Sequence, residues 1–188
     1  GADLEAGIAG RRKRLGEVAE ENDSLRTFLC GEFDSALEGA RQRAVRNYEA
    51  AGMDFDAAIA EEKRTLSPSD FGFHNARRRK DGSLVFLDFE YFGWDDPAKL
   101  TADIVMHPGM VLSADEDGRF RRGLADIYRE DPAYGKRLSA LWPLFGLRWC
   151  LILLNEFLPE RWFRRAYADG GRDRETAQAR QLEKSGAM

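Results

Sequence analysis

Three polar side chains between residues 66 and 97 have the types and the spacing that phosphoryl transfer uses. Asp70 precedes Asn75 by five residues, and Asp88 follows Asp70 by eighteen residues, at the end of an apolar run. In transfer from a magnesium–nucleotide complex, one Asp accepts the proton of the attacking hydroxyl. An Asn oxygen helps to bind magnesium, and a second Asp bridges the metal and the phosphates. We therefore predict Asp70 as the catalytic base, and Asn75 and Asp88 as magnesium and cofactor ligands.

A β-hairpin over residues 76–90 is predicted to bring these side chains together. Asp81-Gly82 is a strong signal for a two-residue turn, and the following Leu84–Leu87 segment is suited to a buried strand. The hairpin would fold back and deliver Asp88 beside the loop that precedes it. The predicted site is therefore assembled within one short stretch of the chain.

Each of these residues also has an ordinary structural alternative. Asp70 could cap its loop, Asn75 could form an Asx turn, and Asp88 could be a turn former at a strand end. Glu90 lies two residues after Asp88 and would point to the same face of an extended chain. We predict that Glu90 supports a second metal ion, and an exposed hairpin glutamate is the alternative.

Residues 70–72 spell Asp-Phe-Gly, the tripeptide in which protein kinases place a metal-binding Asp. That role would require an upstream Asp with an Asn five residues after it. Asp54 and Asp56 have Ile59 and Glu61 at that offset, and the segment before the tripeptide has a helical pattern. The base assignment is therefore the better interpretation of this Asp.

The ordered set of motifs resembles the core of the aminoglycoside phosphotransferase and choline-kinase-like family. The resemblance rests on the segment from Ser69 to Asn75, on LDFEY at 87–91 and on GWDDP at 93–97. Family members usually carry His-Gly-Asp, four residues and Asn, then a strand ending in Asp-x-Asp or Asp-x-Glu, and then a Gly-x-x-Asp-Pro-like turn. Pro68 stands where the family's His normally lies.

The resemblance implies a mainly α fold with a small β-hairpin, equivalent to the larger, C-terminal lobe of a protein-kinase-like enzyme. It implies transfer of phosphate from ATP, with Mg²⁺, to a hydroxyl of a small-molecule substrate. Residues 1–65 contain no glycine-rich phosphate loop and no strand bearing a Lys, so the N-terminal nucleotide-binding lobe is expected to be missing from this chain. The initial Gly favours a lobe cut from a longer protein. This chain alone is expected to show little or no ATP turnover.

We predict a single domain over residues 1–188. Residues 1–65 are expected to be helical, 66–97 to hold the catalytic loop and hairpin, 97–168 to form further helices, and 169–188 to be a peripheral or frayed tail.

Several helix ends can be predicted from capping signals. The expected helices are 4–20, a helix from Asp23 or Ser24 to Gly52, a short helix from Phe55 to Arg64, a helix from Asp96-Pro97 to His107, and 117–130.

Composition excludes several classes of protein. The net charge of −4 gives no footprint for nucleic acid. Cys30 and Cys150 are too few for a disulfide framework or a zinc site. The apolar stretch within residues 132–168 is interrupted by Pro143 and Arg148, so we predict buried helices and no membrane span. No leader is present, and we expect a cytoplasmic protein.

Other interpretations remain open. A non-catalytic kinase-like module that binds a ligand or partner is the main alternative, and a magnesium-dependent hydrolase is a third. Asp95 or Asp103 could brace the catalytic loop. The Arg11–Arg14 and Arg77–Lys80 runs are expected to be solvated, and His74 and His107 to have packing or hydrogen-bonding roles. The chain also has aromatic and acidic residues that could suit a cationic, amine-bearing acceptor substrate: Tyr91, Trp94, Glu156 and Glu160.

Overall fold

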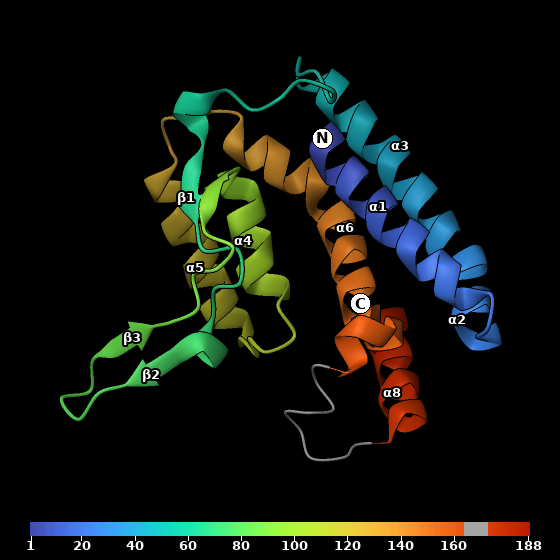
Figure 1. Ribbon diagram of the computed structural model, residues 1–188. Coiled ribbons are helices and arrows are strands. Elements are labelled where there is room, and N and C mark those ends of the chain that lie inside the picture. The colour runs from blue at the N-terminus through green and yellow to red at the C-terminus, as the bar shows by residue number, and fades with distance from the viewer. Residues whose placement is uncertain (164–172) are drawn as a thin grey trace.

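Helices from both ends of the chain pack around one long helix, α6 (Tyr134–Leu153), in the computed structural model (Figure 1). The structure describes residues 1–163 and 173–188. The mainly α fold class is confirmed for these residues. The other described helices of at least six residues are α1 (Ala2–Ala19), α2 (Asp23–Phe28), α3 (Asp34–Ala50), α4 (Pro97–Met106), α5 (Ala114–Ile127) and α8 (Arg174–Gly186).

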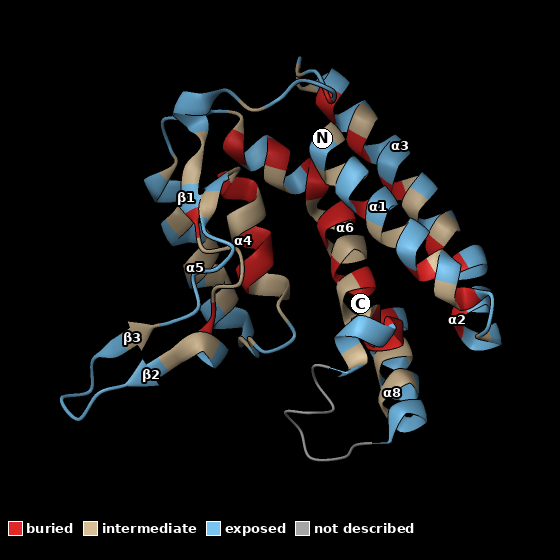
Figure 2. Ribbon diagram, in the orientation of Figure 1, coloured by how far each residue is buried: buried red, intermediate tan, exposed pale blue. Residues whose placement is uncertain are grey.

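The hydrophobic core lies where α1, α3, α4 and α8 contact α6. Leu144, Phe145 and Leu151 of α6 are fully buried there, together with Leu25 and Phe33 from the N-terminal half. Figure 2 shows this buried surface on the inner faces of the helices. The segment Tyr134–Phe157, α6 with its 3-10 continuation η4 (Leu154–Phe157), is long and apolar enough to cross a bilayer by length and composition alone. In the fold it is the central helix of the core. The part of the predicted helical stretch at 164–168 lies outside the described residues.

The N-terminal helices are close to the prediction, with one error. A π-helical turn, η1 (Leu29–Phe33), joins α2 to α3, so helical structure continues from Asp23 to Ala50. The predicted helix over 55–64 is wrong, because only η2 (Glu61–Lys63) forms there. Asp54, directly before that segment, accepts a hydrogen bond from the amide of Asp56 in a tight turn.

Contacts with the rest of the fold hold the segment after α3 in an irregular path. Gly52 follows α3 with a φ of 69°, a left-handed conformation that terminates helices. Phe55 is buried, its ring lies edge-on to that of Tyr48, and its carbonyl accepts a hydrogen bond from the amide of Ala2. These tertiary contacts override the local helical pattern.

Local caps set the ends of the central helices as expected. The Asp96 side chain accepts a hydrogen bond from the amide of Ala98, Pro97 occupies the first turn of α4, and the helix ends before His107. Helix α5 begins three residues earlier than predicted because Ser113 and Glu116 form a reciprocal capping box.

The C-terminal tail is not frayed. Within residues 173–188, Arg174–Gly186 form α8, which packs on α6, whereas 169–172 lie outside the described residues. Ser185 is buried and its hydroxyl donates to the carbonyl of Cys150, while the Cys150 thiol donates to the carbonyl of Ser185. Burial raises the pKa of the Cys150 thiol to about 11. Cys150 is therefore a packing residue of this helix pair.

Two small antiparallel sheets form the β structure. Strands β2 (Ala76–Arg78) and β3 (Leu84–Phe86) make the predicted hairpin. Strands β1 (Thr65–Ser67) and β4 (Gly93–Asp95) make a second sheet that was not predicted. Its strands are three residues long and far apart in sequence, and no turn signal links them.

The hairpin projects from the helical body, and its tip is exposed (Figures 1 and 2). Its turn is longer than the predicted two residues. The amide of Gly82 donates to the carbonyl of Arg79, and Gly82 has a φ of 86°. The amide of Arg79 then donates to the carbonyl of Ser83, which is a type I turn followed by a left-handed residue. At the base of the hairpin, Phe86 stacks on Phe71 at 4.4 Å between ring centroids.

Candidate functional site

The two sheets hold the Asp70 loop and the Asp88 loop side by side. Residues 68–75 connect β1 to β2, and residues 87–92 connect β3 to β4. At one end of these loops Ser67 pairs with Gly93, and at the other end Ala76 pairs with Phe86. Both loops therefore run between the same two sheets and lie beside each other.

A backbone hydrogen bond ties the two loops together. The amide of Leu87, directly before Asp88, donates to the carbonyl of Asn75 over 2.8 Å. The Asn75 side chain faces its own loop, where its Nδ2 donates to the carbonyl of Asp70 over 3.0 Å. This bond uses the amide nitrogen, so the amide oxygen of Asn75 is left available to a ligand.

Both loops contain strained backbone. Ser69 has a φ of 60° and Asp88 a φ of 64°, and among the described residues these are the non-glycine residues with positive φ. A left-handed conformation costs a non-glycine residue of order 1–3 kcal/mol and tends to occur at functional sites. One strained residue directly precedes the predicted base, and the other is a predicted metal ligand.

Two histidines hold the Asp70 carboxylate. Its Oδ1 lies 3.0 Å from Nε2 of His74 and 3.3 Å from Nε2 of His107. The amide of Gly109 donates to Nδ1 of His107 over 2.9 Å, so Nδ1 is the acceptor nitrogen and Nε2 carries the hydrogen. Burial, followed by the nearby His74, lowers the pKa of His107 below its usual value. Neutral His107 therefore donates a hydrogen bond to Asp70.

Asp70, His74 and His107 have ligand atoms within 4.8 Å of one another, which raises the question of a metal site. The two imidazole rings are stacked with centroids 4.1 Å apart and planes 2° from parallel. A metal binds the lone pair in the plane of an imidazole, and the lone pairs of parallel stacked rings cannot converge on one ion. Nε2 of His107 also carries a hydrogen. This cluster is therefore a hydrogen-bonded support for Asp70.

Asp88 and Glu90 are exposed and are not part of that three-residue cluster. Their loop lies against the Asp70 loop, although the structure does not gather all the predicted carboxylates into one group of ligand atoms. Magnesium prefers hard oxygen ligands. The free amide oxygen of Asn75 and the carboxylate of Asp88 are ligands of that kind, so these residues fit the expected ion.

Asp70 borders a pocket of about 680 Å³ between α1, α6, α8 and the loop after α4. The side chain of Asp70 is 40% exposed, which leaves it accessible from this pocket. The other polar or charged residues that line this pocket are Arg11, Ser69, Tyr91, His107, Arg148, Asn155, Arg161, Gln181 and Lys184. The packing residues that line it are Pro108, Gly109, Trp149, Ile152 and Leu153.

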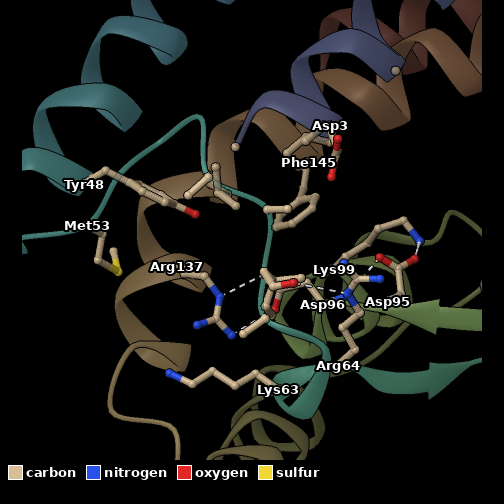
Figure 3. Close-up of a pocket in the computed structure, with 18 of the residues that line it drawn as sticks. Asp3, Tyr48, Met53, Lys63, Arg64, Asp95, Asp96, Lys99, Arg137 and Phe145 are labelled. Atoms are coloured by element: carbon tan, nitrogen blue, oxygen red, sulfur yellow. Dashed lines mark hydrogen bonds and ion pairs between the residues drawn. The ribbon is translucent and has the colours of Figure 1, made fainter.

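A second pocket, of about 570 Å³, lies near the start of α1 and the end of α3 (Figure 3). Tyr48 points into it, and its hydroxyl is buried with no hydrogen-bond partner among the described residues. Burial raises the pKa of Tyr48 to about 12. Arg137 is held on another wall by bonds of 2.9 Å to Asp96 and 2.8 Å to Asp131. Arg11 and Arg148 line both pockets.

The two aspartates considered as braces for the catalytic loop bond elsewhere. Asp95 pairs with Lys99. Asp103 pairs with Arg148 over 2.5 Å and lies 3.1 Å from Lys99. Asp103 therefore links α4 to α6. It holds Arg148, which lines both pockets, and does not brace the catalytic loop.

Some residues of this site were not recognised in the sequence. His107 was assigned a structural hydrogen bond, and its contact with Asp70 spans 37 positions in the chain. Arg11 was placed in a solvated run, yet it lines both pockets and is only partly exposed. Lys13 and Arg14 of that run are exposed, as expected. No local motif signals contacts of such long range.

Comparisons with protein families, with curated proteins and with solved structures found no match to this chain.

Proposed function

We propose that this chain is the catalytic, acceptor-binding lobe of an ATP- and magnesium-dependent phosphotransferase that acts on a hydroxyl of a small molecule. The observation that supports this most strongly is the pair of loops held between two small sheets. Ser69, directly before Asp70, and Asp88 both have strained backbone, and they lie on neighbouring loops. A backbone hydrogen bond from Leu87 to Asn75 joins these loops. Proton acceptance and metal binding at neighbouring positions are what phosphoryl transfer needs.

Asp70 acts as the general base. Its Oδ1 is held by His74 and His107, and its Oδ2 has no hydrogen-bond partner within residues 1–163 and 173–188. This free oxygen accepts the proton of the acceptor hydroxyl. Neutral His107 orients the carboxylate through the hydrogen bond that it donates. A general base contributes roughly 10²–10⁴ in rate when it is positioned in this way.

Asn75 and Asp88 would hold magnesium, with Glu90 as a candidate ligand for a second ion. Bound magnesium would neutralise charge on the phosphates of ATP. A nucleotide-binding lobe, as a further domain or partner, would grip the rest of ATP. Because phosphoryl transfer depends on positioning and electrostatics, the chain without that lobe would turn over little or no ATP. We propose that the protein carries out this reaction in the cytoplasm.

Manganese binding to the 188-residue chain is expected to be centred on the two loops. Mn²⁺ takes the same carboxylate and carbonyl ligands as Mg²⁺, and its unpaired electrons broaden the NMR signals of nearby nuclei. A Mn²⁺ titration should broaden amide signals of residues 68–75 and 87–92 first, and excess Mg²⁺ should reverse the effect.

Asp88→Asn should weaken this broadening, because it removes a negative charge from the ligand set. Asp126→Asn, a change at an exposed position on α5, serves as the control and should leave it unchanged. Broadening centred elsewhere, or insensitive to Asp88→Asn, would reject the metal assignment and favour the non-catalytic binding module.

A further inference from the structure

The pocket beside Asp70 is strongly basic. Arg11 from α1, Arg148 from α6, Arg161 from the segment after η4, and Lys184 from α8 line it, against the single carboxylate of Asp70 among the described lining residues. These cations come from parts of the chain that are far apart in sequence, so the fold gathers them. Close cations repel one another, and the effect grows as they leave water.

Most of this positive charge is not neutralised by the protein. Arg148 is paired with Asp103. The side chains of Arg11, Arg161 and Lys184 have no ion pair or hydrogen bond within the part of the chain that the structure describes. Arg161 and Lys184 are exposed to water, whereas Arg11 is only partly exposed. Burial lowers the pKa of Arg11, and the neighbouring Arg148 lowers it further.

Trp149, which lines the same pocket, carries a buried hydrogen-bond donor. Trp149 is 5% exposed, and its indole N–H has no partner among the described residues. A buried donor without a partner is destabilising. The indole N–H can only donate, so the group that satisfies it must be an acceptor. Unpaired cations together with an unpaired donor define a site for an oxyanion.

We infer that the acceptor of this reaction carries a phosphate or carboxylate group, which binds to Arg11, Arg161, Lys184 and the Trp149 indole beside Asp70. This inference rests on the proposed function and names the substrate class. A cationic, amine-bearing acceptor, which the aromatic and acidic residues of the sequence had suggested, would meet repulsion in this pocket. The volume of about 680 Å³ suits a small molecule.

The position of the pocket assigns the anion to the acceptor instead of to ATP. Asp70 lines the pocket, whereas Asn75 and Asp88, the proposed ligands of the nucleotide-bound metal, do not. An oxyanion in this pocket would therefore lie on the acceptor side of the base. The acceptor would be an alcohol that already carries a phosphate or carboxylate group, with its free hydroxyl directed to Asp70.

Titration of the 188-residue chain with glycerol 3-phosphate, inorganic phosphate and choline at constant ionic strength tests this inference. Glycerol 3-phosphate and inorganic phosphate should shift the indole N–H signal of Trp149, and choline should not. Arg11→Gln should weaken glycerol 3-phosphate binding about tenfold or more, because hydrogen bonds to charged groups are worth roughly 1.5–3 kcal/mol. Arg43→Gln, at an exposed position on α3, is the control and should bind like the parent.

Equal binding of choline, or an Arg11→Gln variant that binds glycerol 3-phosphate like the parent, would overturn the inference. Binding of ATP in this pocket in preference to glycerol 3-phosphate would also overturn it. The proposed function fails separately: if manganese does not bind the two loops but phosphate binding depends on Arg11, the oxyanion site stands and phosphotransfer falls.

Discussion

Asp70→Asn is expected to lower turnover of the full gene product about 10²–10⁴-fold, which corresponds to roughly 3–5.5 kcal/mol in the activation free energy. Asparagine keeps the shape of the side chain, and its oxygen can still accept the hydrogen bond from Nε2 of His107. It cannot accept the proton of the substrate hydroxyl. The loss should therefore appear in kcat, with the substrate affinity largely retained.

Steady-state phosphorylation of an alcohol by the parent and the variant is the measurement. Asp115→Asn, at an exposed position near the start of α5, is a matched control for the change of charge and should keep parental turnover. Thermal melts should show that Asp70→Asn folds like the parent, because Asp70 is partly exposed. Turnover of Asp70→Asn near that of the parent would show that Asp70 is not the base.

Asp103→Leu is expected to have the largest effect on stability. The Asp103 side chain is 2% exposed, and it pairs with Arg148, which is 15% exposed. Removal of one partner of a buried ion pair leaves the other charge uncompensated and typically costs 3–5 kcal/mol. We expect a loss of about that size in the free energy of unfolding, measured by urea denaturation.

Two further variants separate this loss from a general effect of removing charge. Asp23→Leu breaks the exposed pair with Arg26 and should cost less than about 1 kcal/mol. The double variant Asp103→Leu with Arg148→Met should recover much of the loss, because it leaves no unpaired charge in the core. An effect of Asp103→Leu no larger than that of Asp23→Leu would contradict the structural role of this pair.

Local signals in the sequence were enough to predict the hairpin and several helix ends. Asp96-Pro97 starts α4, Gly52 follows the end of α3, and Asp81-Gly82 marks the turn of the hairpin. Each signal acts within a few residues, so the surrounding fold does not alter it. The exact turn type was not predicted, because Gly82 takes the left-handed position after the turn instead of a central one.

Tertiary contacts decided the features that local patterns could not predict. Phe55 is drawn into the core and breaks the expected helix. The pairing of β1 with β4 depends on residues 65–67 meeting residues 93–95. Docking of α8 depends on contacts such as that between Cys150 and Ser185, in a tail whose sequence is mostly polar.

The candidate site shows the same division. Asp70, Asn75 and Asp88 were selected from their order within one short stretch, and the structure brings their loops together. The histidine support and the basic pocket were not foreseen, because His107, directly after α4, and Arg11 of α1 are far from Asp70 in sequence. Motif spacing therefore selected the candidate groups, and the fold supplied their surroundings.

A magnesium titration of turnover by Asp70→Asn and Asp88→Asn in the full gene product tests the central claim most directly. Asp88→Asn weakens a site for a hard cation, so a high magnesium concentration should partly restore its turnover. Asp70→Asn lacks the base, and magnesium should not restore it. If magnesium rescues both variants equally, or rescues Asp70→Asn alone, then Asp70 and Asp88 do not have the separate roles of base and metal ligand.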